Sequence, residues 1–313
     1  MHLPDNRRIK NAANESIKKA SSDPGKLVAF HTAIVLALSL VVLAIDFVLE
    51  RQIGNTGGLS GVGVRSVLET VQTVLQQVQS IALPFWQIGW LYATVKIARG
   101  ETAEKADLLE GFRRFPAFLR LKILKGLIFA GLGIAAAYAG AFLVMMTPLA
   151  DPMVGLMNAD LTNMTQEQLM AQMEPMILPM AVICCALALV LMVPFFYRFR
   201  MAEYFLLDNP GCGARVSMRA SREMMRGNMW KLMRLDLSFW WFWLLTIIVS
   251  ALGIADLLLP LLGITMPWTA EIGYFGAYLL AAAAQVALYY YFKAHLDVTY
   301  AHAYMSLLPA NET

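Results

Sequence analysis

The sequence has little charge. Only 15% of its 313 residues are Asp, Glu, Lys or Arg and 58% are hydrophobic, whereas about a quarter of an ordinary soluble domain is charged. The hydrophobic residues gather in runs of about 20, which a helix exposed to water cannot bury. This composition nearly excludes a soluble enzyme and predicts an integral membrane protein.

Cysteine is equally scarce. The chain has three, and two of them, Cys184 and Cys185, lie inside a hydrophobic run, where thiols behave as small apolar side chains. Three cysteines cannot build a disulfide framework. A net charge of +3 is too small for a nucleic-acid binder, so we expect no nucleic-acid partner.

The common catalytic and ligand-binding motifs are missing as well. The sequence contains no P-loop, no His-Glu-x-x-His pair, no Gly-x-Ser-x-Gly elbow and no Cys-x-x-Cys pair. His295 and His302 share a helical face, which favours the polar side of a helix over a metal site. Methionines between Met153 and Met180 would suit copper(I), but methionine commonly fills apolar gaps. We therefore expect no enzymatic activity, no cofactor and no metal.

Six hydrophobic stretches are long enough to cross a bilayer, because a helix rising 1.5 Å per residue needs about 20 residues to span about 30 Å of hydrocarbon. We expect an all-helical bundle with six spans, at about residues 27–49, 80–98, 124–146, 176–197, 236–260 and 274–292. The first run is too long for a signal peptide. The expected organisation is a basic N-terminal segment (1–26), one membrane domain (27–305) and a tail (306–313).

Lysine and arginine are unevenly distributed between the connections. The N-terminal segment carries six, the connections after the second and fourth spans carry eight each, and the alternate connections carry only Arg51 and Arg65. Cationic loops are retained in the cytoplasm during membrane insertion. The sequence therefore predicts that both termini are cytoplasmic.

The two connections on the predicted outer side differ in character. A glycine-rich stretch, Gly54–Gly63, precedes apolar residues at helical spacing from Val67 to Val78, which predicts an amphipathic helix leading into the second span. Residues 148–175 hold no cation, four acidic residues and many methionines. A protein partner in the membrane or at this loop is one hypothesis.

Four arginines form a stripe on a predicted cytoplasmic helix. Their spacings of 4, 3 and 4 put them on one face: Arg215, Arg219, Arg222 and Arg226. A turn at Asn209–Gly211 should precede the helix, and Gly227 should end it. Guanidinium groups match phosphate oxygens, so one interpretation is a site for an anionic headgroup or phosphate. The other is an interfacial helix held to anionic lipids of the cytoplasmic leaflet.

Polar residues at or within the spans are further candidates for a membrane or interface site. Asp236 begins the fifth span, where a negative charge near a helix N-terminus is favourable. It either fastens the cytoplasmic helix to the bundle, through Arg234 or the arginine stripe, or binds a proton or ligand. Gln87 and Gln285 lie deeper, where polar groups are costly.

Small residues recur every fourth position in two spans and predict close helix contacts. The two lines are Gly133, Ala137 and Ala141 in the third span, and Gly273, Ala277 and Ala281 in the sixth. Gln285 continues the second line and is expected to hydrogen-bond across that contact.

Several segments together resemble a known family. They are Ala98–Glu101, Asp107–Phe112, Met201–Tyr204 with Asp208–Pro210, Ser221–Gly227 and Leu235–Phe239. Their order and spacing over about residues 80–305 are similar to the bacterial integral membrane family called domain of unknown function 975. That family in turn is similar to the membrane domain of some glycerophosphodiester phosphodiesterases. The resemblance implies a helical bundle in the bacterial plasma membrane and brings no activity or catalytic residues.

Two functions fit these observations. A non-enzymatic accessory or scaffold subunit of a membrane complex fits a chain with packing faces and no catalytic constellation. The alternative is a carrier or flippase-like protein for a lipid or another amphiphile, which the arginine stripe favours. A weak internal repeat, residues 111–121 against 227–235, also favours it, because transporters often contain repeats.

Overall fold

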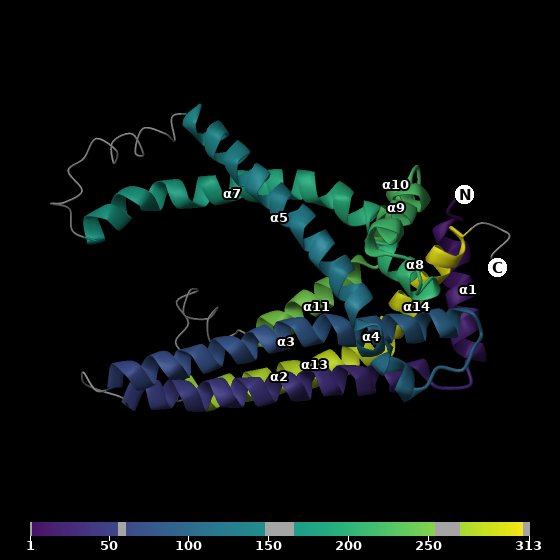
Figure 1. Ribbon diagram of the computed structural model, residues 1–313, viewed down its shortest axis with the longest axis horizontal. Helices are drawn as coiled ribbons and strands as arrows, with labels where there is room; N and C mark the ends of the chain where they lie inside the picture. Colours follow the sequence, from purple (N-terminus) through teal and green to yellow (C-terminus); the bar gives the residue numbers. More distant parts are fainter. Residues whose placement is uncertain (1, 56–60, 148–165, 254–269, 309–313) are drawn as a thin grey trace. The chain divides into compact units, whose positions relative to one another are not determined.

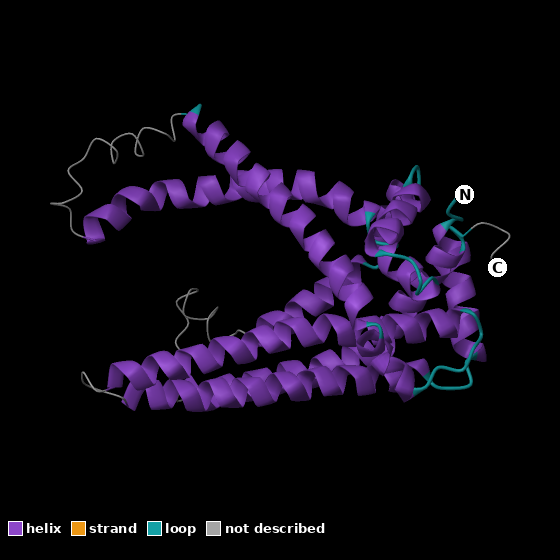
Figure 2. Cartoon of the chain, viewed as in Figure 1, coloured by secondary structure: helices purple, strands orange, loops and turns teal. Residues whose placement is uncertain are grey.

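The computed structural model describes residues 2–55, 61–147, 166–253 and 270–308. Within these ranges every regular element is a helix (Figures 1 and 2). The predicted all-helical fold is therefore confirmed for this part of the chain. Most of the acidic outer loop, 148–175, and the end of the predicted fifth span lie outside the described residues.

Three stretches are long and apolar enough to cross a membrane. They are Pro24–Leu49 within α2 (Pro24–Asn55), Phe115–Met145, which is α5, and Met180–Asp208, which includes the end of α7 (Gln166–Arg198) and α8 (Ala202–Asp208). The bent pair of α10 (Met229–Leu237) and α11 (Trp240–Gly253), with 58° between them, would make a fourth. The described residues are thus consistent with a membrane protein, and the six-span arrangement stays a prediction.

Two helices are longer than expected. α3 (Gly61–Ala98) has 38 residues, so the predicted amphipathic segment and the second span form one continuous helix. It runs antiparallel to α2 (Figure 1), and Gln79 Nε2 donates to Ser39 Oγ at 2.9 Å. α7 begins at Gln166 instead of at about 176, so part of the predicted outer connection is helical.

The chain divides into two compact units. The first combines residues 1–118, 207–210 and 230–313. It contains α1 (Asn6–Lys19), α2, α3, η1 (Lys105–Leu109), α4 (Glu110–Arg113), α10 from Trp230 onwards and α11, followed by α13 (Ala270–Leu288), the π-helical η3 (Tyr289–Lys293) and α14 (Ala294–Met305). α1 packs against α14, where Ile9 and Ala13 of α1 and Tyr304 of α14 are fully buried.

Two glycines let α3 contact the following segment backbone to backbone. A Cβ at Gly89 would lie 1.8 Å from the carbonyl oxygen of Leu108, and a Cβ at Gly111 would lie 2.0 Å from the carbonyl oxygen of Phe85. Real Cβ atoms cannot approach that closely, so only glycine fits at either position. The contact fixes η1 and α4 on α3.

The second unit, residues 119–206 and 211–229, contains α5, α7, α8 and α9 (Ala214–Met225). A Cβ at Gly140 of α5 would lie 2.5 Å from Cys184 Sγ of α7, so these helices approach closely there. The prediction that Gly133, Ala137 and Ala141 form the close contact of this span was partly wrong. Gly133 does face α7, but Ala137 and Ala141 are exposed, because the buried face of α5 continues through Gly140 instead.

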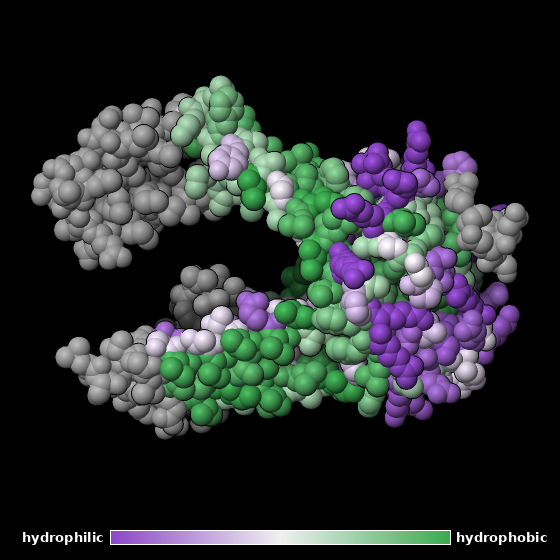
Figure 3. Space-filling model, viewed as in Figure 1, coloured by the Kyte–Doolittle hydropathy of each residue, from purple (hydrophilic) through white to green (hydrophobic). Residues whose placement is uncertain are grey.

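Apolar side chains cover the remaining surface of α5 and α7. Tyr138 of α5 is 76% exposed and Val190 of α7 is 70% exposed. In Figure 3 the described parts of the long helices are mostly green, whereas the hydrophilic side chains gather over α9 and over α1 and α4. Such surfaces are typical of helices that face lipid.

Candidate anion-binding site

α9 carries the predicted arginine stripe. A turn at Pro210 and Gly211 precedes the helix, and Gly227 follows it with a φ of +80°. Both predicted boundaries are confirmed. Glycine adopts a positive φ without a steric penalty, which explains why the helix ends here.

Two serines one turn apart fasten α9 to the preceding helices. Ser217 Oγ donates to the carbonyl oxygen of Ala202, and Ser221 Oγ donates to the carbonyl oxygen of Arg198 at 2.9 Å. Met218, Met224 and Met225 are buried on the same side. Because this side faces the protein, the arginines are left on the exposed side of α9.

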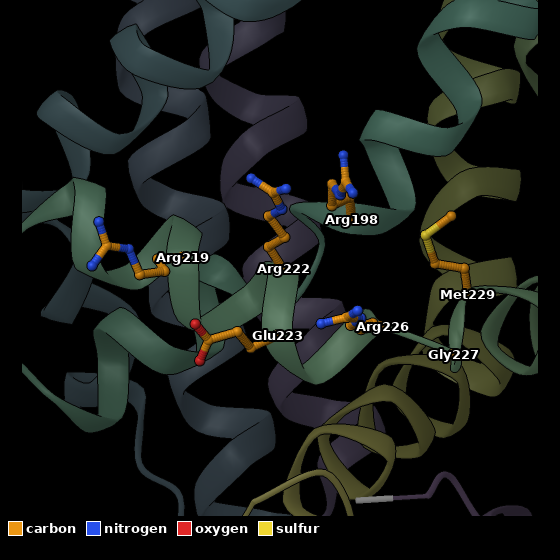
Figure 4. Close-up of a pocket in the computed structure, with 7 residues that line it drawn as sticks. All are labelled: Arg198, Arg219, Arg222, Glu223, Arg226, Gly227 and Met229. Carbon is orange, nitrogen blue, oxygen red and sulfur yellow. The ribbon is translucent and has the colours of Figure 1, made fainter.

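The arginines gather around an open cavity of about 580 Å³ (Figure 4). We call it the arginine pocket, and its lining residues are Arg198, Arg219, Arg222, Glu223, Arg226, Gly227 and Met229. Arg198 ends α7 and is half-buried. Arg219 and Arg222 of α9 and Arg226, which directly follows α9, are exposed. Arg215 belongs to the predicted stripe but does not line the pocket.

The arginine pocket holds an uncompensated positive charge. Its lining contains four guanidinium groups and one carboxylate, that of Glu223. Within the residues that the structure describes, none of these five groups forms a salt bridge. The Arg198 guanidinium lies 5.9 Å from the centroid of the Phe195 ring, a weak cation–π contact. The pocket therefore suits an anion with several acceptor oxygens.

The other predicted polar residues do not form a site with one another. Asp236 of α10 accepts a hydrogen bond from the Tyr300 hydroxyl of α14, which fits the fastening role. Gln87 is exposed on α3 and Gln285 is half-buried on α13. No hydrogen bond among the described residues joins any two of the three, and none crosses a helix contact from Gln285.

A second cavity of about 200 Å³ lies beside α1. Its lining residues are Lys10, Asn14, Phe239, Trp241, Phe242, Phe292, His295 and Thr299. Lys10 Nζ lies 4.0 Å from the centroid of the Phe239 ring and 3.4 Å from the carbonyl oxygen of Ser238, and burial lowers the pKa of its ammonium group. These contacts give Lys10 a role in holding α1, so the cavity is a weaker candidate than the arginine pocket.

The two histidines also serve the α1–α14 contact. His295 Nδ1 lies 2.9 Å from Asn14 Oδ1, and His302 Nε2 lies 2.9 Å from Ser16 Oγ. Burial lowers the pKa of both imidazoles, which favours their neutral forms. In the described ranges no three His, Cys, Asp or Glu side chains are grouped closely enough to hold a metal ion.

Comparison with known proteins agrees with the resemblance seen in the sequence. The model of a family described as Protein of unknown function (DUF975) matches residues 9–295. The chain belongs to the DUF975 family. No curated protein and no solved structure matches it. The DUF975 match includes the whole arginine pocket, and the similarity to glycerophosphodiester phosphodiesterase membrane domains stays a prediction.

Most of the residues that carry the DUF975 resemblance have a packing role. Asp107 accepts from Lys96 Nζ at 2.9 Å, and Asp208 accepts from Arg99 Nη2 and from Tyr304 Oη at 2.7 Å each. Leu108, Met201, Ala202, Met225 and Leu235 are fully buried. Arg222, Glu223 and Arg226 differ because they are exposed and line the arginine pocket.

Sequence reasoning missed Arg198 and the two serines of α9. Arg198 lies 17 to 28 positions before the stripe in the chain, and only the folding of α9 back onto the end of α7 brings it to the same cavity. The serines did leave a signal, since Ser217 and Ser221 are four residues apart and therefore share a helical face.

Proposed function

We propose that this protein binds the phosphate-bearing headgroup of an anionic amphiphile in the arginine pocket and acts as a carrier or flippase-like protein. The single observation that supports the proposal best is that one cavity is lined by four guanidinium groups, none of which forms a salt bridge with any described residue. The proposed setting is the bacterial plasma membrane, with both termini cytoplasmic.

The chemistry of the pocket favours phosphate over other anions. A guanidinium group presents donors in a planar fork that matches two phosphate oxygens at once. The cavity of about 580 Å³ also falls within the range of about 300–1,000 Å³ usual for ligand sites. Glu223 opposes an anion by repulsion, but it is one carboxylate among four cations.

The position of the pocket favours an amphiphile over a soluble phosphate compound. The apolar stretch Met180–Asp208 includes Arg198, which directly follows Phe195, Phe196 and Tyr197. Aromatic residues commonly lie at headgroup level, where apolar chains meet water. Val190 and Val193 of α7 are exposed one to two turns before the pocket, so an acyl chain has an apolar surface beside its bound headgroup.

Two observations support the proposed topology. Cations are concentrated in alternate connections, which favours cytoplasmic retention of the pocket. In addition, α1 and α14 pack against each other within one compact unit, through pairs such as Asn14 with His295. A contact between the first and last helices requires them to lie on the same side of the membrane, so it favours an even number of crossings.

The test is a titration of the purified full-length protein in neutral detergent with a short-chain phosphatidic acid. We expect Arg219→Gln combined with Arg222→Gln to weaken binding at least about ten-fold, because a hydrogen bond to a charged group contributes about 1.5–3 kcal/mol. A parallel titration with inorganic phosphate separates headgroup recognition from a need for the acyl chain. High salt should weaken binding in both titrations.

Arg215→Gln is the matched control, because Arg215 lies on the same helix and the same stripe but outside the pocket. It should leave the affinity unchanged. If Arg215→Gln weakens binding as much as a change at Arg222, the stripe attracts anionic lipids without a defined site, and the pocket proposal is wrong. Glu223→Gln should strengthen binding.

The accessory or scaffold function remains the competing hypothesis. It predicts that a membrane protein co-purifies with the chain, through the apolar faces of α5 and α7 or through the loop 148–175, and that pocket variants leave this association intact. A carrier instead predicts transbilayer movement of labelled phosphatidic acid in proteoliposomes, lost in the Arg219→Gln, Arg222→Gln variant. Neither function needs catalysis, so the non-enzymatic expectation stays part of the proposal.

A further inference from the structure

His31 of α2 is enclosed by two tryptophans of α3. The residue is only 4% exposed. Its ring stacks on that of Trp86, with 5.7 Å between the centroids, and lies 5.9 Å from the Trp90 ring. Trp86 Nε1 also donates to the backbone carbonyl oxygen of His31 at 3.3 Å. The three residues belong to the first compact unit, so the imidazole is held within one unit.

One ring nitrogen of His31 is a buried acceptor without a donor. Nε2 lies 3.3 Å from the carbonyl oxygen of Trp86, which can only accept, so Nε2 carries the proton of the neutral ring. Nδ1 is then the bare nitrogen, and it is buried without a hydrogen-bond partner among the residues that the structure describes. A phenylalanine of similar shape would avoid this cost. Packing alone therefore does not explain a histidine at this position.

A largely buried ion pair lies near the His31 ring. Lys293 Nζ lies 3.0 Å from Asp297 Oδ2, and Trp90 Nε1 donates to the same oxygen at 2.6 Å. The side chains of Lys293 and Asp297 are 23% and 16% exposed, and removing such charges from water is costly. Both charges act on the imidazole of His31. The Trp90 ring connects the ion pair to His31, because it contacts both.

Lys293 is the last residue of a π-helical turn. This turn, η3, joins α13 to α14 and packs against α2. Such turns are rare and are frequently found at functional sites. An unpartnered acceptor, two largely buried charges and a π-helical turn therefore occur together, and a group of unfavourable features is typical of a functional site.

We propose that Nδ1 of His31 binds a proton, and that the Asp297 carboxylate then leaves Lys293 to become the partner of the imidazolium. The arrangement described above is the proton-free form, in which Nδ1 is bare and Asp297 is paired. The proton comes from water, and no bond between heavy atoms changes. Histidine and carboxylate side chains form proton relays in membrane pumps and transporters.

A proton fits this site better than a larger ligand does. The enclosed ring of His31 leaves no room for a molecule, and within the described ranges no three potential metal ligands are grouped. A water molecule that donates to Nδ1 would leave the ring neutral at every pH, which the experiment below distinguishes. The proposal uses no residue of the arginine pocket and does not rest on the proposed function.

Other titratable groups on the neighbouring elements have contacts of their own. They are Tyr278 of α13, which hydrogen-bonds to Ser39, Lys105 of η1, which lies 4.7 Å from the centroid of the Phe30 ring, His295 of α14, which lies 2.9 Å from Asn14, and Tyr289 of η3 and Tyr92 of α3, which lie under the ammonium groups of Lys293 and Lys96. We therefore expect Lys293 and Asp297 to control the protonation of His31.

The test is an NMR titration of isotope-labelled histidine rings in the purified full-length protein, from about pH 8 down to the pH at which the protein unfolds. Loss of one signal in His31→Phe, or in His31→Gln if the first variant does not fold, identifies His31. We expect a neutral ring with its proton on Nε2 at the start of the titration. On acidification Nδ1 should also become protonated.

Two variants change the charges that control this step. At a fixed acidic pH, the ratio of charged to neutral His31 should fall at least about ten-fold in Asp297→Asn and rise at least about ten-fold in Lys293→Gln, because one loses the partner and the other loses the repulsion. Asp23→Asn and Lys26→Gln are the matched controls. They change an exposed salt bridge on the same helix and should leave the ratio unchanged.

Three results would overturn the proposal. A His31 ring that stays neutral until the protein unfolds would mean that Nδ1 binds no proton. A neutral ring with its proton on Nδ1 would mean that this nitrogen already has a partner. An unchanged ratio in Asp297→Asn or in Lys293→Gln would mean that the ion pair does not control the site. If one of these two variants does not fold, the other decides, and the titration of the unchanged protein needs neither.

Discussion

The charged groups of this protein are used differently in two regions. In the first region, each cation forms a salt bridge with a carboxylate. We call this region the paired corner, and its three pairs are Lys96 with Asp107, Arg99 with Asp208, and Arg114 with Glu110. In the second, the arginine pocket, four guanidinium groups surround a cavity, and none forms a salt bridge with any residue that the structure describes. Both regions carry segments of the DUF975 resemblance.

The contrast separates structural charges from available ones. In the paired corner Arg114 also donates to the carbonyl oxygen of Leu207 at 2.7 Å, so its charge joins two segments of the chain. In α9 like charges recur at spacings of three and four, which lowers the stability of a helix by a few tenths of a kcal/mol per pair. A helix selected for stability alone would alternate its charges. The uncompensated charge of the pocket therefore favours a ligand-binding role.

The largest effect is expected beside the paired corner, from Gly89→Ala, because Gly89 contacts Leu108, the neighbour of Asp107. The new Cβ would lie 1.8 Å from the carbonyl oxygen of Leu108, so η1 and α4 would be displaced from α3. Such overpacking typically costs about 1–3 kcal/mol and sometimes more. Thermal unfolding of the purified protein should show a marked loss of stability, or the protein should fail to fold.

Gly131→Ala is the control for this change, because a Cβ at Gly131 meets no atom within 4 Å. Its melting temperature should equal that of the unchanged protein or lie slightly above it, because alanine is more favourable than glycine inside a helix. If the two variants melt alike, the backbone contact between α3 and η1 does not exist as described.

A smaller change in stability is expected from Asp208→Ala, which should destabilise the protein, whereas Arg222→Gln should not. Asp208→Ala removes the carboxylate that accepts from both Arg99 and the Tyr304 hydroxyl, and we expect a cost of about 1–2 kcal/mol. The Arg99 side chain is 38% exposed, so water replaces part of the interaction. Arg222→Gln removes repulsion and should leave the ligand-free protein equally or slightly more stable. Thermal melting of both variants checks the comparison, and destabilisation by Arg222→Gln would place Arg222 in a structural role.

The smallest change in stability is expected at the α1–α14 contact, where neutral imidazoles form hydrogen bonds instead of ion pairs. Burial lowers the pKa of His295 and His302 from 6.5, so the unfolded chain binds protons more readily than the folded one. The contact is fully stable above pH 6.5 and weakens as the pH falls below it. Lys10, which shares a cavity with His295, adds repulsion once the imidazole is charged.

The readout is the melting temperature between about pH 7.5 and about pH 5.5. It should fall on acidification in the unchanged protein and fall less in His302→Asn, which keeps a polar partner for Ser16 without a titrating ring. An identical pH dependence in both proteins would mean that other groups control the acid sensitivity.

Several elements of the fold could be predicted from the sequence because local patterns determine them. The limits of α9 follow from the turn before it and from Gly227, since a positive φ ends a helix wherever glycine allows it. The apolar run of α5 predicts a helix of membrane-crossing length in the same way. The start of α3 at Gly61 could not be predicted, because the glycine-rich stretch Gly54–Gly63 indicated a loop up to residue 63.

The arginine pocket shows the limit of what local sequence patterns can predict. The spacing of Arg219, Arg222 and Arg226 shows that they share a face, but Arg215 has the same spacing and does not line the pocket. Likewise, the four-residue spacing of Gly133, Ala137 and Ala141 does not reveal that the close contact runs through Gly140. Helical periodicity predicts which residues share a face of a helix. It does not predict which part of that face contacts a neighbouring helix.

The amino-acid sequence by itself determined that the chain is helical, apolar enough for a membrane, and basic at one set of connections, because these properties depend on composition and on periodicity within one helix. Only the tertiary structure decided which charges are neutralised and which remain available. That outcome depends on contacts between residues far apart in the chain, such as Arg99 with Asp208 and Arg198 with the arginines of α9. Whether two charges pair depends on the distance between them in the folded protein, because the interaction energy of charges in water becomes small beyond a few ångströms. No local sequence pattern determines that distance.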